Sequence, residues 1–176
     1  SVHLPQFEIT RALSAIGKHR ISFFPATPQM VESMGNYLLV DKKRVSSVER
    51  CLAAGPELTE EMIQNFEKRT GRKVIGGYAP PSILTLTHAH PVAGKHKDGS
   101  VGLPISDTEA KIVDPANLEK EMAAGEAGEL VIRGPQLMKG FADMPEETGK
   151  RIRDGWLYTG ERARMDEDGF FYILGK

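Results

Sequence analysis

The chain has 176 residues, of which 40% are apolar and 27% charged, so it can form one substantial domain or two small ones around a real core. Its 23 basic residues oppose 24 acidic ones without any long block of like charge, which argues against a nucleic-acid partner. A single cysteine excludes an internal disulfide, and neither a secretion signal nor a run of roughly 20 apolar residues is present. We therefore expect a cytoplasmic protein.

Helical and strand-like patterns alternate from the first residues onward. Apolar residues recur at helical spacing over 7–16, and the strand-like run ISFFP follows at 21–25. A second helix is predicted over 28–39, where four apolar side chains form one stripe that ends at Leu38. The segment RCLAAG, 50–55, has the pattern of a short strand that ends in a glycine turn.

The helix with the clearest boundaries is predicted to begin after Thr59, a residue type that favours the N-cap position. Acidic residues occupy its first turn and basic residues its last, which complements the helix dipole, and Gly71 follows. KVIGGY, 73–78, is the next predicted strand. Strands and helices that alternate with short connections predict an α/β fold over 1–90, namely a parallel sheet with covering helices, as in part of a doubly wound subdomain.

The pattern changes in the second half, 91–176. Only one segment, 145–152, looks helical, and residues 117–128 are predicted to form a solvated loop. Four short segments rich in β-forming residues are separated by Gly, Pro and Asp: GSVGLPI, TEAKIVD, GELVIRG and GFFYILG. These segments predict a mainly antiparallel subdomain resembling a small β-barrel.

Two loops are candidates for a ligand site, because ligands of parallel α/β sheets bind at the carboxyl ends of the strands. One loop is AAGPEL, 53–58, and the other is GGYAPPSILTLTHAH, 76–90. If their strands are neighbours, Gly55 and Pro56 face Tyr78 across a slot that suits a flat ring. In the alternative interpretation, which the pattern alone favours, the glycines simply form turns and Tyr78 packs in the core.

Other reactive side chains carry weaker signals. His88 and His90, with the later His96 and Asp98, lack the spacing of a zinc or facial-triad site, so no metal site is expected. Cys51 lies in a strand-like context typical of a buried, inert thiol. In the stretch YTGE, the carboxylate of Glu161 could accept hydrogen bonds from two sugar hydroxyls, although by pattern alone it is a surface glutamate. The acidic tip at 166–169 predicts a hairpin.

Taken together and in order, these stretches resemble the adenylate-forming superfamily, and most closely its fatty acyl-CoA synthetases. FFPATPQM, SSVERCLAAGPELTEEMIQNFEKRTG and GGYAPPS resemble the family's acyl-pocket, adenine-loop and Gly-Tyr-Gly-x-Thr-Glu segments. GSVGLPISDTEAKIVD, GEAGELVIRGPQLMKGF and DGWLYTGERARMDEDGFFYILGK are similar to the later segments. The resemblance implies that ATP activates a fatty acid to an acyl-adenylate, with release of pyrophosphate, before transfer of the acyl group to coenzyme A.

The resemblance also implies roles for individual residues. Gly55 and Pro56 would lie against adenine, Tyr78 would stack on its face, and Gly77 would sit near the acyl carboxylate. At two later positions the family has a related but different residue. Glu161 stands where the family has the aspartate that holds the ribose hydroxyls. Lys176 stands where the family commonly has an arginine that opens the hinge to the C-terminal domain.

The departures from the family pattern concern the phosphate half of the site. Pro81 replaces the threonine that contacts phosphate, and Ser82 replaces the glutamate that holds Mg²⁺. The family's upstream phosphate loop and the lysine of its small C-terminal domain are not found among these residues. We therefore expect a fragment of a fatty acyl-CoA synthetase, missing N-terminal and C-terminal parts of the parent enzyme and inactive alone. The alternative is a non-catalytic nucleotide-binding or interaction module derived from an adenylating enzyme.

Overall fold

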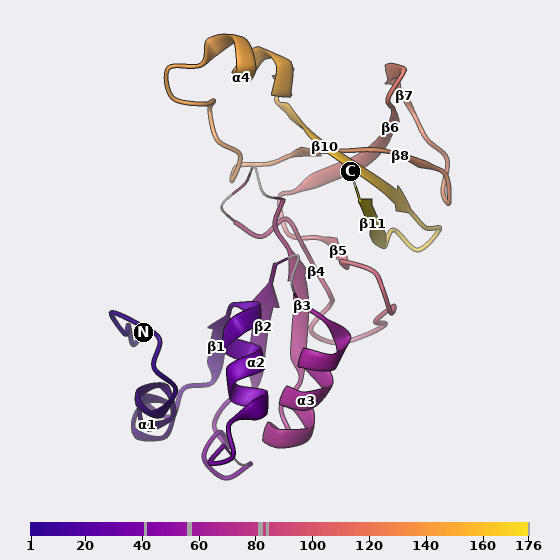
Figure 1. Ribbon diagram of the computed structural model, residues 1–176. Coiled ribbons are helices and arrows are strands. Elements are labelled where there is room, and N and C mark those ends of the chain that lie inside the picture. Colours follow the sequence, from indigo (N-terminus) through magenta and orange to yellow (C-terminus); the bar gives the residue numbers. More distant parts are fainter. Residues whose placement is uncertain (41, 56–57, 81–82, 84, 176) are drawn as a thin grey trace. The chain divides into compact units, whose positions relative to one another are not determined.

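The computed structural model describes residues 1–176 except for 41, 56–57, 81–82, 84 and 176 (Figure 1). The chain divides into two compact units, Ser1–Gly76 and Gly77–Lys176. None of the helices in the described part of the chain has the length and apolar character that a bilayer crossing requires.

The first unit places helices beside a short parallel sheet. Strands β1 and β2 are parallel, with Phe24 opposite Cys51, and β2 is followed in the sheet by β3, whose last two residues belong to the second unit. The elements in chain order are α1 Ile9–His19, β1 Phe23–Ala26, α2 Pro28–Asn36, β2 Arg50–Ala54, α3 Glu60–Thr70 and β3 Val74–Tyr78.

Local capping accounts for where α3 begins and ends. The Thr59 hydroxyl accepts a hydrogen bond from the Met62 amide at 3.2 Å, and Gly71 ends the helix in the left-handed region with φ +68°. These are the predicted boundaries. By contrast, α2 ends at Asn36, three residues before the predicted end at 39, because the chain turns there to bring Val40 into the core. Leu38, expected on the buried stripe, is 80% exposed.

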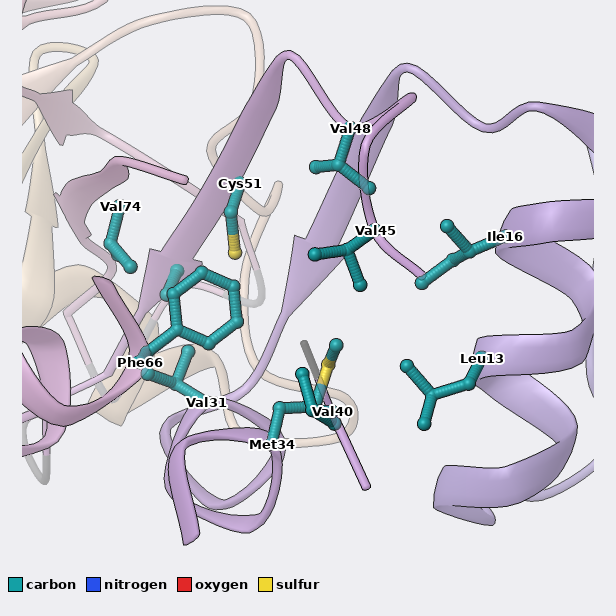
Figure 2. Packing of buried hydrophobic residues seen from close by; sticks show 11 residues of the cluster. Leu13, Ile16, Val31, Met34, Val40, Val45, Val48, Cys51, Phe66 and Val74 are labelled. Atoms are coloured by element: carbon teal, nitrogen blue, oxygen red, sulfur yellow. The ribbon is translucent and has the colours of Figure 1, made fainter. Parts of the chain in front are cut away.

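The core of the first unit lies between the helices and the sheet (Figure 2). Phe66 from α3 packs with Val31 from α2 and Cys51 from β2, and all three are almost completely buried. Burial raises the pKa of the Cys51 thiol to about 12, so the thiol stays protonated near neutral pH. The helices α2 and α3 approach closely at Gly35, where an added Cβ would lie 3.0 Å from the Phe66 amide nitrogen.

The second unit contains a six-stranded antiparallel sheet in the order β11-β10-β8-β6-β7, with β9 paired to β10. Within the described residues this order has two ends, so the sheet is open. It forms part of a barrel and not a closed barrel. The elements are β4 His88–Ala89, β5 Leu103–Pro104, β6 Glu109–Asp114, β7 Asn117–Glu121, β8 Ala127–Arg133, α4 Pro145–Arg151, β9 Ile152–Arg153, β10 Trp156–Met165 and β11 Phe171–Gly175.

The structure corrects the prediction of a wholly parallel sheet. Strands β1 and β2 pair in parallel, whereas β3 pairs antiparallel with β4 and β4 antiparallel with β5, so the sheet is mixed. The physical reason is the short connection after Tyr78. A parallel return needs a crossover of about a dozen residues or more, and the chain re-enters the sheet at His88.

The predicted loop at 117–128 is also wrong. Residues Asn117–Glu121 form strand β7, which pairs antiparallel with β6, and β8 already begins at Ala127. Ion pairs across the β6–β7 hairpin, Lys111 to Glu121 at 2.7 Å and Lys120 to Asp114 at 3.6 Å, account for a strand that has little apolar character. The predicted hairpin at the acidic tip is confirmed, since β10 and β11 pair antiparallel on either side of it.

Candidate functional site

The stretch YTGE forms a bulge in β10. Tyr158 pairs with Val131 and Arg162 with Glu129, so three residues of β10 oppose the single residue Leu130 of β8. Gly160 occupies the left-handed region with φ +71°, a conformation that glycine adopts without strain. Bulges of this kind redirect side chains and are frequent beside binding sites.

The Thr159 hydroxyl holds the bulge together. It donates a hydrogen bond to the Leu130 carbonyl at 2.8 Å and accepts one from the Glu161 amide at 3.1 Å. The Gly160 amide donates to the Glu129 carboxylate at 2.9 Å. Sequence reasoning did not assign Thr159 a role. The signal for it was the alternation along the strand, which puts Thr159 and Glu161 on the same face as apolar neighbours.

Glu161 is buried, not a surface glutamate as its pattern alone indicated. Only 8% of it is exposed, and it lies between Thr159 and Ala163 on the inner face of β10. A carboxylate has about four lone-pair positions, so it can accept several hydrogen bonds at once. Burial makes each such bond stronger than it would be in water.

We expect Thr159→Val to destabilise the second unit by about 1 to 3 kcal/mol, because it leaves the buried Glu161 amide and Leu130 carbonyl without their partner. Urea unfolding followed by the fluorescence of Trp156, the only tryptophan in the chain, measures this loss. Thr159→Ser keeps the hydroxyl and serves as the matched control. Equal midpoints for the two variants would contradict the role of the hydroxyl.

Gly77 and Tyr78 pair with Ala89 and His88 across β3 and β4. An added Cβ at Gly77 would lie 2.5 Å from Leu86 Cδ1, so glycine permits a close approach there. Tyr78 is 6% exposed and belongs to the same buried cluster as Leu157 and Ala163, which flank the bulge of β10. Its ring thus packs in the core, and its hydroxyl oxygen has no hydrogen-bond partner among the described residues.

His88 is the most deeply buried titratable group in this region. Its Nδ1 lies 3.0 Å from the Thr87 hydroxyl, which also donates to the Tyr78 carbonyl at 3.2 Å. Its ring lies 4.7 Å from that of Phe171, centroid to centroid. Burial lowers the pKa of His88 to about 4, so the imidazole is neutral in the folded protein.

This shift of the His88 pKa predicts a loss of stability in acid. Because the unfolded chain binds a proton near the ordinary pKa of 6.5, stability falls as the pH drops below 6.5 and levels off near 4, by about 3 kcal/mol in total. Urea midpoints from pH 7 to pH 4 test this, with His88→Gln as the comparison. Burial also lowers the pKa of His90, so the stability of the His88→Gln variant should still fall to some extent as the pH drops. An unchanged slope in His88→Gln would contradict the assignment.

Gly55 follows β2 in the first unit, at the carboxyl end of the strand as the sequence indicated. Its φ is +145°, and an added Cβ would lie 3.0 Å from Pro28 Cγ at the start of α2, so the position requires glycine. Pro56, Pro81, Ser82 and Lys176 lie outside the described residues. No group of three or more His, Cys, Asp or Glu side chains in the described part of the chain is arranged to hold a metal ion.

Sequence reasoning missed a hollow of about 740 Å³ in the first unit. It lies where α2 and α3 end, whereas Gly55 lies near the beginning of α2, so the hollow is separate from the predicted adenine loop. Most of the polar residues that line it are basic. The lining residues are Gly35, Asn36, Leu38, Val40, Lys42, Lys43, Asn65, Lys68 and Arg69.

Comparison with known proteins gives consistent matches. The family described as AMP-binding enzyme matches residues 1–142. The long-chain-fatty-acid–CoA ligase of Bacillus subtilis (strain 168) is 40% identical over 174 residues, which are 98% of this chain and 31% of the ligase. A feruloyl-CoA synthase of an Amycolatopsis species is 30% identical over 174 residues, covering 97% of this chain and 34% of the synthase.

A solved structure shares the fold. The crystal structure of ATP-bound MatB from Rhodopseudomonas palustris superposes with a TM-score of 0.85 at 24% identity, covering 99% of this chain and 34% of MatB. The chain thus spans about a third of the length of each of these proteins.

Proposed function

Because this chain belongs to the AMP-binding enzyme family, we propose that it is the part of a fatty acyl-CoA synthetase that holds the adenosine half of the nucleotide. The resemblance to a long-chain-fatty-acid–CoA ligase supports a fatty acid as the parent enzyme's substrate. The observation that carries the proposal is the bulge at Thr159–Glu161, which holds a buried carboxylate on the inner face of β10.

In the proposed parent reaction, a carboxylate oxygen of the fatty acid attacks the α-phosphorus of ATP and the bond to the β-phosphate oxygen breaks, releasing pyrophosphate. The thiol of coenzyme A then attacks the acyl carbon of the acyl-adenylate, loses its proton, and displaces AMP. Both steps need a nucleotide held firmly by its base and sugar, because positioning alone supplies a large part of the rate.

The residues of this chain contribute to binding and orientation. Glu161 accepts hydrogen bonds from the two ribose hydroxyls, which are neighbouring donors that one carboxylate can engage together. The resemblance assigns contacts with adenine to Gly55 and Pro56, and the stacking contact to Tyr78. The resemblance assigns Gly77 a position near the acyl carboxylate. In this proposal Lys176 stands at the hinge to the C-terminal domain.

The residues present do not fit a magnesium site. Ser82 offers one neutral oxygen where Mg²⁺ prefers carboxylate, and the described residues hold no cluster of acidic side chains that replaces it. Pro81 cannot donate a hydrogen bond to phosphate. We therefore propose no step through the metal, and we propose that the isolated chain does not catalyse adenylation.

Binding measurements with a series of nucleosides test the proposal. By isothermal titration calorimetry, we expect adenosine, AMP and ATP to bind with similar affinity and 2′-deoxyadenosine to bind more weakly. Incubation with ATP, Mg²⁺ and palmitate should release no pyrophosphate. If ATP binds far more tightly than adenosine, this chain holds the phosphates and the proposal is wrong; if adenosine does not bind, the ribose site is wrong.

The second candidate is a non-catalytic module derived from an adenylating enzyme, and the specific observation in its favour is the pair Pro81 and Ser82. The double variant Pro81→Thr/Ser82→Glu restores the family's residues. If the chain descends from an active site that has only lost its phosphate contacts, we expect this variant to bind ATP in the presence of Mg²⁺ more tightly than AMP. Unchanged affinities would favour a module that has no use for the phosphates.

A further inference from the structure

The basic hollow in the first unit lies beside the two most exposed leucines among the described residues. Leu38, which lines it, is 80% exposed, and the adjacent Leu39 is 58% exposed. Both follow the end of α2, at the end of the unit where α3 also finishes (Figure 1). Large apolar side chains that stay exposed next to each other indicate an interaction surface rather than chance.

The charge around these leucines is positive. Lys42, Lys43, Lys68 and Arg69 line the hollow, and no Asp or Glu is among its described lining residues. Even with Asp41 counted, the sequence at 41–44, DKKR, has a positive net charge. No ion pair between two described residues engages any of the four basic side chains.

Ordinary structural roles explain only part of this arrangement. Arg69 donates a hydrogen bond from Nε to the Gly35 carbonyl at 3.4 Å, and Lys68 complements the dipole at the end of α3. The stem of Lys42 packs over Gly71, where an added Cβ would lie 3.1 Å from Lys42 Cε. None of these contacts explains why Lys43 lines the hollow or why Leu38 and Leu39 are exposed to water.

We propose that this face docks on an anionic lipid bilayer. Leu38 and Leu39 enter the boundary between headgroups and acyl chains, while Lys42, Lys43 and Lys68 contact lipid phosphates in and around the hollow. Apolar side chains that insert, framed by basic residues, are the pattern of peripheral membrane binding. The docking does not depend on the proposed function, but under that function it would bring the chain to the phase in which a fatty acid dissolves.

The test is co-sedimentation of the 176-residue chain with vesicles of phosphatidylcholine alone and with one quarter phosphatidylglycerol. We expect binding to the anionic vesicles, weakened by salt. Each basic residue contributes roughly fivefold near an anionic surface, so Lys42→Gln/Lys43→Gln/Lys68→Gln should lose about a hundredfold. Leu38→Ser/Leu39→Ser should lose about tenfold or more.

The matched control is Lys18→Gln/Lys139→Gln/Lys150→Gln, which removes the same charge elsewhere and should lose far less. Urea midpoints verify that every variant is folded, and adenosine affinity, expected to be unchanged, separates this proposal from the proposed function. Equal losses in both triple variants, equal binding to neutral vesicles, or no binding would overturn docking. Displacement by inorganic phosphate at matched ionic strength would show a soluble phosphate site and would also overturn it.

Discussion

Glu161→Ala should weaken adenosine and AMP binding by about a hundredfold to ten-thousandfold. Each hydrogen bond from a ribose hydroxyl to a carboxylate is worth roughly 1.5 to 3 kcal/mol, and the variant removes two of them from a buried position. Calorimetric titration of the variant against the unchanged chain measures the loss. The effect should be the same for adenosine and AMP, because the residue acts on the sugar.

Two controls distinguish a ribose contact from general damage. Glu161→Asp restores the carboxylate at the length that the family uses, so its affinity should stay within about tenfold of the original. Glu167→Ala removes a carboxylate from the exposed tip between β10 and β11 and should change nothing. A loss of less than threefold for Glu161→Ala, in a chain that still unfolds at the same urea concentration, would remove Glu161 from the binding site.

Gly102→Ala should destabilise the second unit by about 4 kcal/mol or more, since two separate causes combine. The residue has φ +92°, where an L side chain is strained, and an added Cβ would lie 2.2 Å from the carbonyl carbon and oxygen of Ala89. The backbone cannot withdraw easily, because Phe171 and Gly102 pair on the other side: the Phe171 amide donates to the Gly102 carbonyl at 3.0 Å. Urea unfolding followed by Trp156 fluorescence measures the loss.

Gly125→Ala provides the comparison that separates the two causes. Gly125 has a similar conformation, φ +88°, but an added Cβ would meet nothing within 4 Å. This variant should therefore cost only the backbone strain, about 1 to 2 kcal/mol. If both alanine variants lost the same stability, the contact with Ala89 would not contribute, and the close approach of this backbone segment to β4 would be wrong.

Pro81 and Ser82 give the nucleotide proposal its particular form. In the proposed site the sugar is held by Glu161, whereas the triphosphate meets a proline and a neutral hydroxyl. Phosphoryl and adenylyl transfer depend on positioned positive charge around the phosphates. The direct consequence is that this chain should bind adenosine and ATP with equal affinity. Equal affinity would distinguish it from a complete adenylating enzyme.

Much of this protein could be predicted from local sequence signals. The family was evident from the order of its segments, and the boundaries of α3 followed from Thr59 and Gly71, because caps act within one helical turn. Buried Cys51 and the β10–β11 hairpin were likewise readable from alternation and turn residues. Each of these features depends on residues that are close together in the chain.

Tertiary structure decided the features that depend on distant partners. The mixed sheet follows from how the chain returns after Tyr78, and the bulge at Glu161 exists only because Leu130 of β8 faces three residues of β10. The basic hollow joins residues near 35–43 with residues near 65–69 through the close contact of α2 and α3 at Gly35. Strand pairing and helix packing are set by long-range contacts, and one sequence does not state which segments will meet.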